Sequence, residues 1–226
     1  MIKNNIKDVQ NRIRLAAKKA GRDPDDITLV CVTKGADPYM VSEVLVHGVK
    51  DLGENRVQEA GEKIVQVMPG ARWHLIGHLQ TNKVRDAVKI FELIHSVDSV
   101  ELLKKIDKEA QKVGKVMDVL VQINTSGEES KYGIRPEEVL GIMREASVLL
   151  NVRVMGLMTI APISEDPETA RPYMASLRGL SETVRREAIP NIDMRYLSMG
   201  MSQDFEVAIQ EGANMVRIGS AIFKDV

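Results

Sequence analysis

The feature that most constrains the fold is a regular alternation of short apolar runs with helix-like segments along all 226 residues. The run Ile27–Val32 is continuously apolar, which is typical of a strand buried on both faces of a parallel sheet. Seven further strands are predicted at 49–52, 72–76, 91–95, 117–124, 152–159, 194–197 and 214–217. Helices are predicted between them at 39–47, 56–67, 81–88, 100–113, 136–149, 167–188 and 205–211. Such alternation implies right-handed crossovers and a parallel sheet.

Eight strands of this kind predict an α/β protein with a single (β/α)8 TIM barrel that spans 1–226 as one domain. An open doubly wound sheet is the alternative, which a miscount of one strand would favour. An extra N-terminal helix precedes the first strand. Ile6, Val9, Ile13 and Ala17 recur at helical spacing there, and Gly21 can end that helix.

Composition excludes several classes of protein. The 31 basic and 32 acidic residues give a net charge of -1, and aromatic residues are only 4%, so we expect no nucleic-acid binding. No apolar stretch approaches the roughly 18 residues of a membrane span, so we expect no membrane contact. The one cysteine, Cys31, cannot form an internal disulfide, which favours a reducing, cytoplasmic location. No exposed apolar stripe is obvious, which favours a monomer.

Polar residues follow nearly every predicted strand, where the active site of a barrel lies. They are Lys34, Asn55, His78, Ser96, Asp98, Asn124, Thr125, Thr159, Ser198, Ser202, Arg217 and Ser220. Lys34 is the most informative, because a lysine at the mouth of a buried strand can be partly desolvated. Desolvation lowers the pKa of a lysine and frees its amine to attack an aldehyde. A surface lysine that starts a loop is the alternative interpretation.

The C-terminal segment NMVRIGSAIF predicts a phosphate site. Arg217 ends an apolar strand, Gly219 can let a ligand approach the backbone, and Ser220 opens a helix whose N–H groups can bind a phosphate. Phosphate sites after the last two strands recur in this fold. The preceding loop adds Ser198 and Ser202. Two ordinary glycine-containing turns are the alternative. A lysine after the first strand and a phosphate site after the last ones together indicate pyridoxal 5′-phosphate (PLP).

The sequence resembles the pyridoxal-phosphate homeostasis proteins, which are similar to the N-terminal barrel of alanine racemase. The matching segments cover most of the chain in order. They are VTK (32–34), GENRVQE (53–59), WHLIGHLQTNK (73–83), HSVDS (95–99), NTSGEESKYG (124–133), GLMTIAP (156–162), LSMGMSQDF (197–205) and VRIGSAIF (216–223). Arg56 and Lys224 depart from the family, which often has an aromatic residue and a glycine there.

The resemblance implies a role for each matched residue. Lys34 would carry PLP as a Schiff base, and Ser198 or Ser202 would bind the phosphate with the backbone of Gly219 and Ser220. Arg217 would face the pyridine nitrogen, and Asn55 would lie near the ring. Lys131 falls where alanine racemase has an arginine near the phenolic oxygen of the cofactor.

We therefore expect a cytoplasmic protein that binds PLP reversibly, manages its level with apo-enzymes as recipients, and does not act as an enzyme. Arg217 would keep the ring nitrogen unprotonated, which weakens the ring as an electron sink. A 226-residue chain also leaves no room for the second domain that supplies a catalytic tyrosine in alanine racemase.

Two other functions remain open at this stage. An amino-acid racemase would need a second acid/base group, for which His78 and Tyr132 are the candidates. A Schiff-base aldolase acting on a sugar phosphate would need no cofactor. We expect no metal site, because none of His47, His74, His78 and His95 has a partner at metal-ligand spacing.

Overall fold

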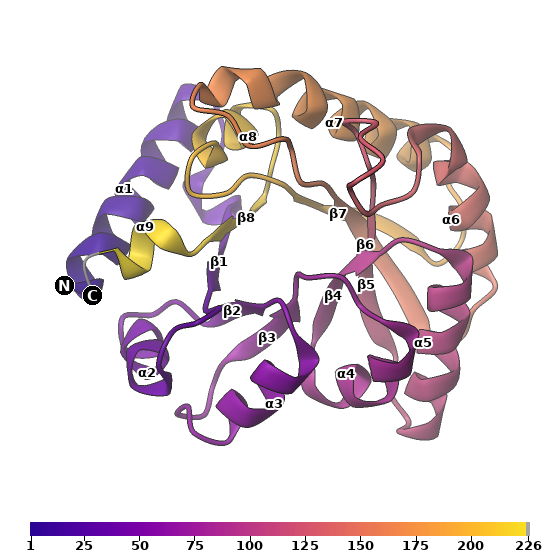
Figure 1. Cartoon of the computed structure of the whole chain (residues 1–226). Coiled ribbons are helices and arrows are strands. Elements are labelled where there is room, and N and C mark those ends of the chain that lie inside the picture. The colour runs from indigo at the N-terminus through magenta and orange to yellow at the C-terminus, as the bar shows by residue number, and fades with distance from the viewer. Residues whose placement is uncertain (225–226) are drawn as a thin grey trace.

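The eight predicted strands close into a barrel in the computed structural model, which describes residues 1–224 (Figure 1). Neighbouring strands pair in parallel, and β8 returns to pair with β1. The strands are β1 Thr28–Val32, β2 Asp51–Glu54, β3 Arg72–Leu75, β4 Leu93–Val97, β5 Met117–Gln122, β6 Val152–Met158, β7 Ile192–Ser198 and β8 Met215–Ile218. The predicted (β/α)8 barrel is thereby confirmed.

Helices form a ring around the barrel. They are α1 Ile2–Lys19, α2 Pro38–Val46, α3 Val57–Ile64, α4 Val84–Ile90, α5 Val100–Lys112, α6 Val139–Ser147, α7 Arg171–Arg186, α8 Phe205–Gln210 and α9 Ser220–Phe223. Short 3-10 turns lie at η1 Pro24–Asp26, η2 Thr81–Lys83, η3 Pro136–Glu138 and η4 Pro167–Ala170. Within residues 1–224, no helix combines the length and the apolar character that a membrane crossing needs.

The extra N-terminal helix is α1, as predicted, and it lies beside α8 and α9 (Figure 1). Its apolar face buries Ile2, Ile6, Val9 and Ile13. Two polar contacts fix its position, because Arg12 donates to Glu206 over 3.0 Å and the Asn5 amide donates to the Ile222 carbonyl over 2.9 Å. The N-terminal helix thus braces the C-terminal helix α9.

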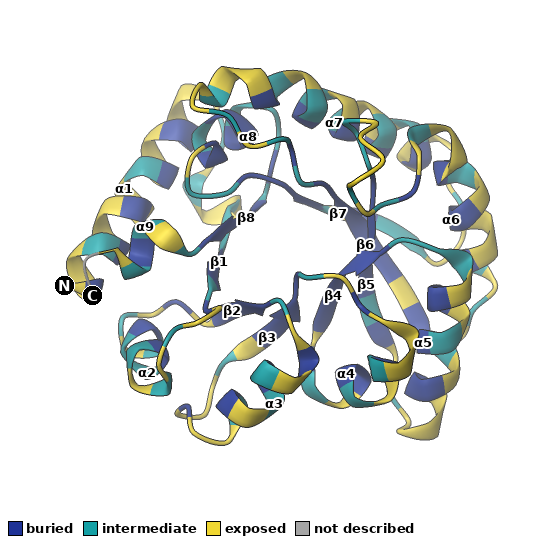
Figure 2. Ribbon diagram, viewed as in Figure 1, coloured by how far each residue is buried: buried dark blue, intermediate teal, exposed yellow. Residues whose placement is uncertain are grey.

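The apolar core has two layers, and Figure 2 shows the strands as a largely buried ring between them. The larger layer fills the space between strands and helices, and the smaller one lies inside the barrel. The inner layer consists of Val30, Leu93, Leu120, Met155, Met158 and Met215. Side chains alternate between the two faces of a strand, so residues in register with these six also point inward.

Several predicted boundaries differ from the structure by a few residues; the second strand, for example, is Asp51–Glu54 rather than 49–52. The fourth strand begins at Leu93 rather than Phe91, because the Phe91 amide still donates to Ala87 and closes α4. This shift puts Ser96 inside β4 instead of after it. The predicted helix 167–188 is divided into η4 and α7, and Pro172 lies in the first turn of α7, where a missing N–H costs nothing.

Candidate functional site

Lys34 directly follows a firmly anchored residue at the end of β1. The Thr33 amide donates to Gly53, and its hydroxyl donates to the Glu54 carboxylate over 2.6 Å. The Lys63 ammonium contacts both the Thr33 carbonyl, at 2.7 Å, and Glu54 Oε1, at 2.5 Å. Because Thr33 and Glu54 are fully buried, the backbone that carries Lys34 has little freedom to move.

The Lys34 side chain itself is exposed, and the chain turns immediately after it through Gly35, whose φ is +73°. The partial desolvation expected from its place after a buried strand is therefore not present. Thr33 is the last fully buried residue here, and the strand has ended at Val32. The protein presents this amine at the barrel mouth as an accessible group on a rigid base.

The chain between β7 and α8 bends back toward β8. The Met199 amide donates to Met215, and the Arg217 amide donates to the Gly200 carbonyl over 3.0 Å, so the pairing continues beyond β7. Gly200 has a φ of +92°, and a Cβ there would lie 2.6 Å from the Ala208 Cβ. This bend directs Ser202 toward α9, where its hydroxyl accepts from the Ala221 amide over 3.3 Å.

A cavity of about 640 Å³ opens at the carboxyl ends of β1 and β8. Its volume is within the range of about 300–1,000 Å³ that is typical of small-molecule sites. Five of the seven predicted cofactor-binding residues line it: Lys34, Ser202, Arg217, Gly219 and Ser220. Asp166, Asp204 and Lys224 also line it, as do Met201 and Phe223. The structure thus brings the amine and the predicted phosphate site to one space.

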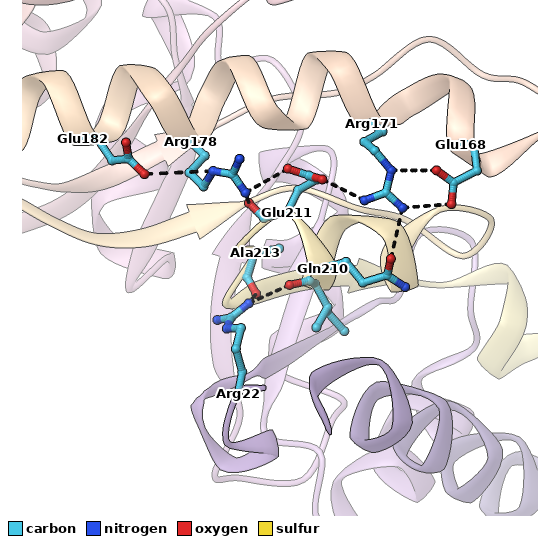
Figure 3. A network of polar contacts seen from close by, with 9 residues as sticks. Arg22, Glu168, Arg171, Arg178, Glu182, Gln210, Glu211 and Ala213 are labelled. Atoms are coloured by element: carbon cyan, nitrogen blue, oxygen red, sulfur yellow. Dashed lines mark hydrogen bonds and ion pairs between the residues drawn. The ribbon is translucent and has the colours of Figure 1, made fainter. Parts of the chain in front are cut away.

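The segment 162–170 after β6 forms one wall of this cavity, which the sequence did not indicate. Its end is held by an ion-pair network on the outside of the barrel (Figure 3). Arg171 at the start of α7 bonds Glu168 through two nitrogens, at 2.6 and 2.9 Å, and contacts Glu211 at 2.7 Å. The Glu168 and Glu211 carboxylates hold the pKa of Arg171 above its ordinary value.

Gly219 lines the cavity, and the structure shows a packing reason for its missing side chain. A Cβ at this position would lie 2.9 Å from the Val32 carbonyl oxygen and 3.1 Å from the Val32 Cβ. The glycine therefore lets the turn after β8 pack against the end of β1. The close contact with Val32 thus excludes a side chain at position 219. The approach of a ligand to this backbone stays a prediction.

Arg217 is a buried cation with one edge on the cavity. Only 4% of the residue is exposed, and burial lowers the pKa of its guanidinium to about 10, an effect that the nearby Asp204 charge partly offsets. NH1 donates to Ser198 Oγ over 2.6 Å, and NH2 donates to the Thr159 carbonyl over 2.8 Å. In residues 1–224, no carboxylate lies within 4.0 Å of this guanidinium.

Burial also raises the pKa of Asp204, which follows Gly200 in the segment between β7 and α8. Its carboxylate accepts a hydrogen bond from the Met201 amide over 2.6 Å, which pulls the pKa the other way. Asp204 therefore shapes the loop that presents Ser202 while it contributes some negative charge to the cavity.

Ser198 does not line the cavity. It is fully buried below Arg217, where its hydroxyl oxygen contacts Arg217 and, at 2.9 Å, His95 Nδ1. His95 Nε2 in turn lies 3.0 Å from His74 Nδ1, and His74 Nε2 lies 3.0 Å from Asp51 Oδ1. Of the two serines predicted to bind phosphate, only Ser202 reaches the cavity.

The sequence reasoning missed this buried polar chain, although both histidines stand in otherwise apolar strands. Register explains why it forms. Arg217 and Asp51 are each in register with Val30, His74 with Leu93, and Ser198 with Met215, so all point into the barrel. His95 lies two residues beyond Leu93 on the same face. The available signal in the sequence was the presence of polar residues, such as His74 and His95, inside predicted buried strands.

Three other residues singled out from the sequence lie away from the cavity. Asn55 is half-buried after β2, Lys131 lines a smaller pocket of about 130 Å³ with Tyr132, and Arg56 is exposed and contacts Glu59 at 3.2 Å. The structure therefore does not bring Asn55 to the cavity that Lys34 and Arg217 share.

His78 and Tyr132, the two candidate acid/base groups, stack on each other at the mouth of the barrel. Their ring centroids are 3.9 Å apart at an interplanar angle of 11°. His78 Nδ1 also lies 3.2 Å from Asp98, a carboxylate whose pKa burial raises. Neither ring lines the main cavity. Among the described residues, no three His, Cys, Asp or Glu side chains are grouped as a metal site would require.

Comparison with known proteins agrees with this geometry. The family model described as "Alanine racemase, N-terminal domain" matches residues 4–226. A pyridoxal phosphate homeostasis protein of Aquifex aeolicus is 44% identical over 216 residues, which cover 95% of this chain and 94% of that protein. The Escherichia coli (strain K12) protein of the same name is 37% identical over 230 residues, covering 98% and 95%.

A solved structure has the same fold along its whole length. PipY of Synechococcus elongatus, solved with PLP bound, is 30% identical and has a TM-score of 0.86, with 99% of this chain and 100% of PipY covered. The sequence resemblance, the family model and the closed barrel agree. The chain therefore belongs to the pyridoxal phosphate homeostasis proteins, a family built on the alanine racemase N-terminal barrel.

Proposed function

We propose that this chain binds PLP in the cavity between β1 and β8, as a Schiff base on Lys34, and acts in PLP homeostasis without robust catalysis. The observation that carries the proposal is the convergence of an accessible amine, a buried guanidinium and the first turn of α9 on one cavity. The PLP found in PipY, and the names of the curated relatives, support the same ligand.

The residues present match the chemical groups of PLP. When bound, PLP supplies an aldehyde that condenses with a primary amine and a pyridine ring that can accept electrons. Lys34 provides the amine, and the Ser202 hydroxyl with the Gly219–Ser220 backbone would hold the phosphate. We propose Ser202 for this role rather than Ser198, whose oxygen is engaged beneath Arg217. The role of Asn55 near the ring stays a prediction.

Arg217 determines what such a site can do. A guanidinium has N–H donors and no acceptor, so the ring nitrogen beside it must accept a hydrogen bond and carry no proton. An unprotonated ring withdraws electrons less strongly from a bound amino acid. The residues of this cavity therefore favour binding and release of the cofactor over catalysis on amino acids.

The test uses two lysines that line the same cavity, Lys34 and Lys224. We expect PLP to give the wild type a Schiff-base absorbance and, after borohydride reduction, a covalent mass increase on the peptide that contains Lys34. Lys34→Ala should lose both signals, whereas the matched control Lys224→Ala should keep them. An adduct on Lys224, or on Lys34→Ala, would refute the assignment.

The same preparations test the lack of catalysis. Alanine incubated in heavy water with the PLP-loaded wild type should exchange its α-proton far below the usual enzyme range of about 1–10³ s⁻¹. Exchange within that range would favour a racemase, and a colourless protein that cleaves a sugar phosphate would favour an aldolase.

We further propose that the protein is a cytoplasmic monomer that can supply PLP to apo-enzymes. The single cysteine, Cys31, is buried and unpaired, which suits a reducing compartment. Light scattering after size exclusion should give a mass close to the 25.1 kDa of one chain. Transfer is measured as activity regained by an apo-enzyme that is separated from the loaded protein by a size-selective membrane, compared with direct mixing.

A further inference from the structure

The polar chain inside the barrel has only one arrangement of protons that satisfies each of its members. Arg217 can only donate, so Ser198 Oγ accepts from it. The serine proton must then go to His95 Nδ1, because this nitrogen is the other polar atom in contact with the hydroxyl. His95 consequently carries its proton on Nε2.

The same assignment of donors and acceptors continues through His74 to Asp51. His95 Nε2–H donates to His74 Nδ1, which leaves His74 with its proton on Nε2, directed at the Asp51 carboxylate. Asp51 also accepts two hydrogen bonds from Arg72, through Nε at 2.7 Å and NH2 at 2.5 Å. Every bond thus points in one direction, from Arg217 to Asp51.

The opposite arrangement leaves a defect. If His74 carried both protons and donated to His95, the Nδ1–H of His95 would point at Ser198. The serine oxygen would then receive two donors, and its own proton would have no acceptor among the described residues. A buried donor left without a partner is costly, because it has given up its hydrogen bond to water and gained none in the protein. Desolvation by burial is the main cause that holds the pKa of His95 well below its ordinary value, and the Arg217 charge acts in the same direction.

This arrangement explains how a buried arginine can stay available to a ligand. A carboxylate beside Arg217 would pair with two of its N–H groups at once. The structure instead offers it two neutral acceptors, Ser198 Oγ and the Thr159 carbonyl. Since a guanidinium has five N–H donors, three remain for the cavity that Arg217 lines. The distant Asp51 charge polarises the neutral acceptor through the chain of hydrogen bonds.

We propose that Ser198, His95 and His74 are positioning residues for Arg217: they form a one-directional relay to Asp51 that holds the guanidinium and leaves its other donors facing the cavity. The ligand-related part rests on the proposed function, because the remaining donors would serve the ring nitrogen of PLP. The proton arrangement rests on the structure alone.

The first test needs no cofactor. Long-range 15N–1H spectra of histidine-labelled protein, assigned with single histidine variants, report which ring nitrogen carries the proton. We expect His74 and His95 both to be neutral with the proton on Nε2 at neutral pH. A proton on Nδ1 of either ring, or a doubly protonated ring, would overturn the relay. This result stands whether or not PLP binds, so failure of the relay and failure of the proposed function remain distinguishable.

The second test separates positioning from general destabilisation by comparing two ligands. One is PLP, and the other is its carba analogue, in which a C–H group replaces the ring nitrogen. His95→Leu, which removes the acceptor of the Ser198 proton, should weaken PLP binding about tenfold, as expected for a disturbed hydrogen bond to a charged group. The analogue should lose less than about twofold, because it has no ring nitrogen for Arg217 to reach.

His95→Asn is the rescue variant, because its amide oxygen can accept the Ser198 proton in place of Nδ1. It should recover most of the PLP affinity, while the control His47→Asn, on a histidine that contacts Glu43 on α2, should change nothing. Equal losses for both ligands in His95→Leu, or no loss for either, would refute the positioning role.

Discussion

Two polar networks of this protein consist of similar residues and differ in where they lie. The relay from Arg217 to Asp51 runs inside the barrel, where four of its five members are at most 4% exposed and Asp51 is 8% exposed. The network around Glu211 lies outside the barrel between α7 and α8 (Figure 3). There Glu211 contacts Arg171 at 2.7 Å and Arg178 at 2.8 Å, and these arginine side chains are 33% and 43% exposed.

The difference shows how location decides what a polar group can do. On the outside, water reaches both arginines and can take the place of a lost carboxylate, so each ion pair adds little stability and tolerates change. Inside, a lost partner leaves a group that nothing replaces, so each bond is obligatory and has a fixed direction. The interior network can therefore define the orientation of Arg217 at the cavity, whereas the exterior network fastens a helix and the end of a loop.

The largest loss of stability is expected at a third polar cluster, formed by Glu54 and Lys63, because it pairs two opposite charges in the interior. Glu54 is fully buried, and it contacts Lys63, which is 8% exposed as a residue. Glu54→Ala would leave this ammonium without its carboxylate, and we expect a loss of about 3–5 kcal/mol in the free energy of unfolding. Urea denaturation followed by circular dichroism measures it.

The control for this variant is Glu54→Leu combined with Lys63→Met, which removes both charges. Replacing a buried pair by apolar residues is often nearly neutral, so the double variant should recover most of the stability. Glu54 Oε2 has no hydrogen-bond partner among the described residues, so the double variant breaks no hydrogen bond of this oxygen. This favours recovery of the stability. A loss below about 1 kcal/mol for Glu54→Ala would show that solvent reaches Lys63 and stabilises it.

The next effect concerns pH and the end of the relay. Burial alone would raise the pKa of Asp51, but hydrogen bonds from His74 and Arg72 outweigh it and lower the pKa from 3.8 to about 2. A group with a depressed folded-state pKa stabilises the protein above its ordinary pKa and loses that effect as the pH falls through the folded value. The contribution of Asp51, about 2 kcal/mol, should therefore disappear between about pH 4 and pH 2.

The measurement compares wild type with Asp51→Asn by chemical denaturation at several pH values. Near pH 7 the variant should be less stable by about 2 kcal/mol, and the two proteins should converge as the pH approaches 2. A difference that stays constant from pH 7 to pH 2.5 would mean that the Asp51 charge does not stabilise the fold.

The smallest effect is expected outside the barrel. Glu211→Gln removes the charge between Arg171 and Arg178, and we expect a loss of about 1 kcal/mol or less, since both arginines reach solvent. The loss should shrink further in 0.5 M salt, because screening weakens exposed pairs. Thermal or urea unfolding at two salt concentrations measures it.

Glu187→Gln is the matched control, because Glu187 contacts Arg144 at 3.5 Å in the ring of helices and these side chains are 44% and 65% exposed. It should change stability by less than about 0.5 kcal/mol. If Glu211→Gln cost as much as Glu54→Ala, the contrast between interior and exterior networks would be wrong.

Much of the lining of the cavity could be predicted from the sequence because it lies in short segments at strand ends. Lys34, Gly219 and Ser220 follow buried strands, and Arg217 is the next-to-last residue of β8. A closed parallel barrel brings such positions together. Segment 162–170 could not be predicted as a cavity wall, because a loop without a periodic pattern does not reveal which way it turns. Asn55 also comes directly after a strand, β2, and still does not line the cavity.

The sequence by itself determined the order of strands and helices, because the alternation of apolar runs and helical patterns is a local property of the chain. It also placed the strand ends to within about two residues, although Ser96, expected after a strand, lies inside β4. Only the tertiary structure decided which faces of the strands meet inside the barrel. A shift of one residue turns a side chain from one face to the other, and register shifts do occur between β4, β5 and β6. Which faces meet inside the barrel explains why Ser198 lies beneath Arg217 instead of in the cavity. It also explains why the His74 and His95 rings meet at 3.0 Å.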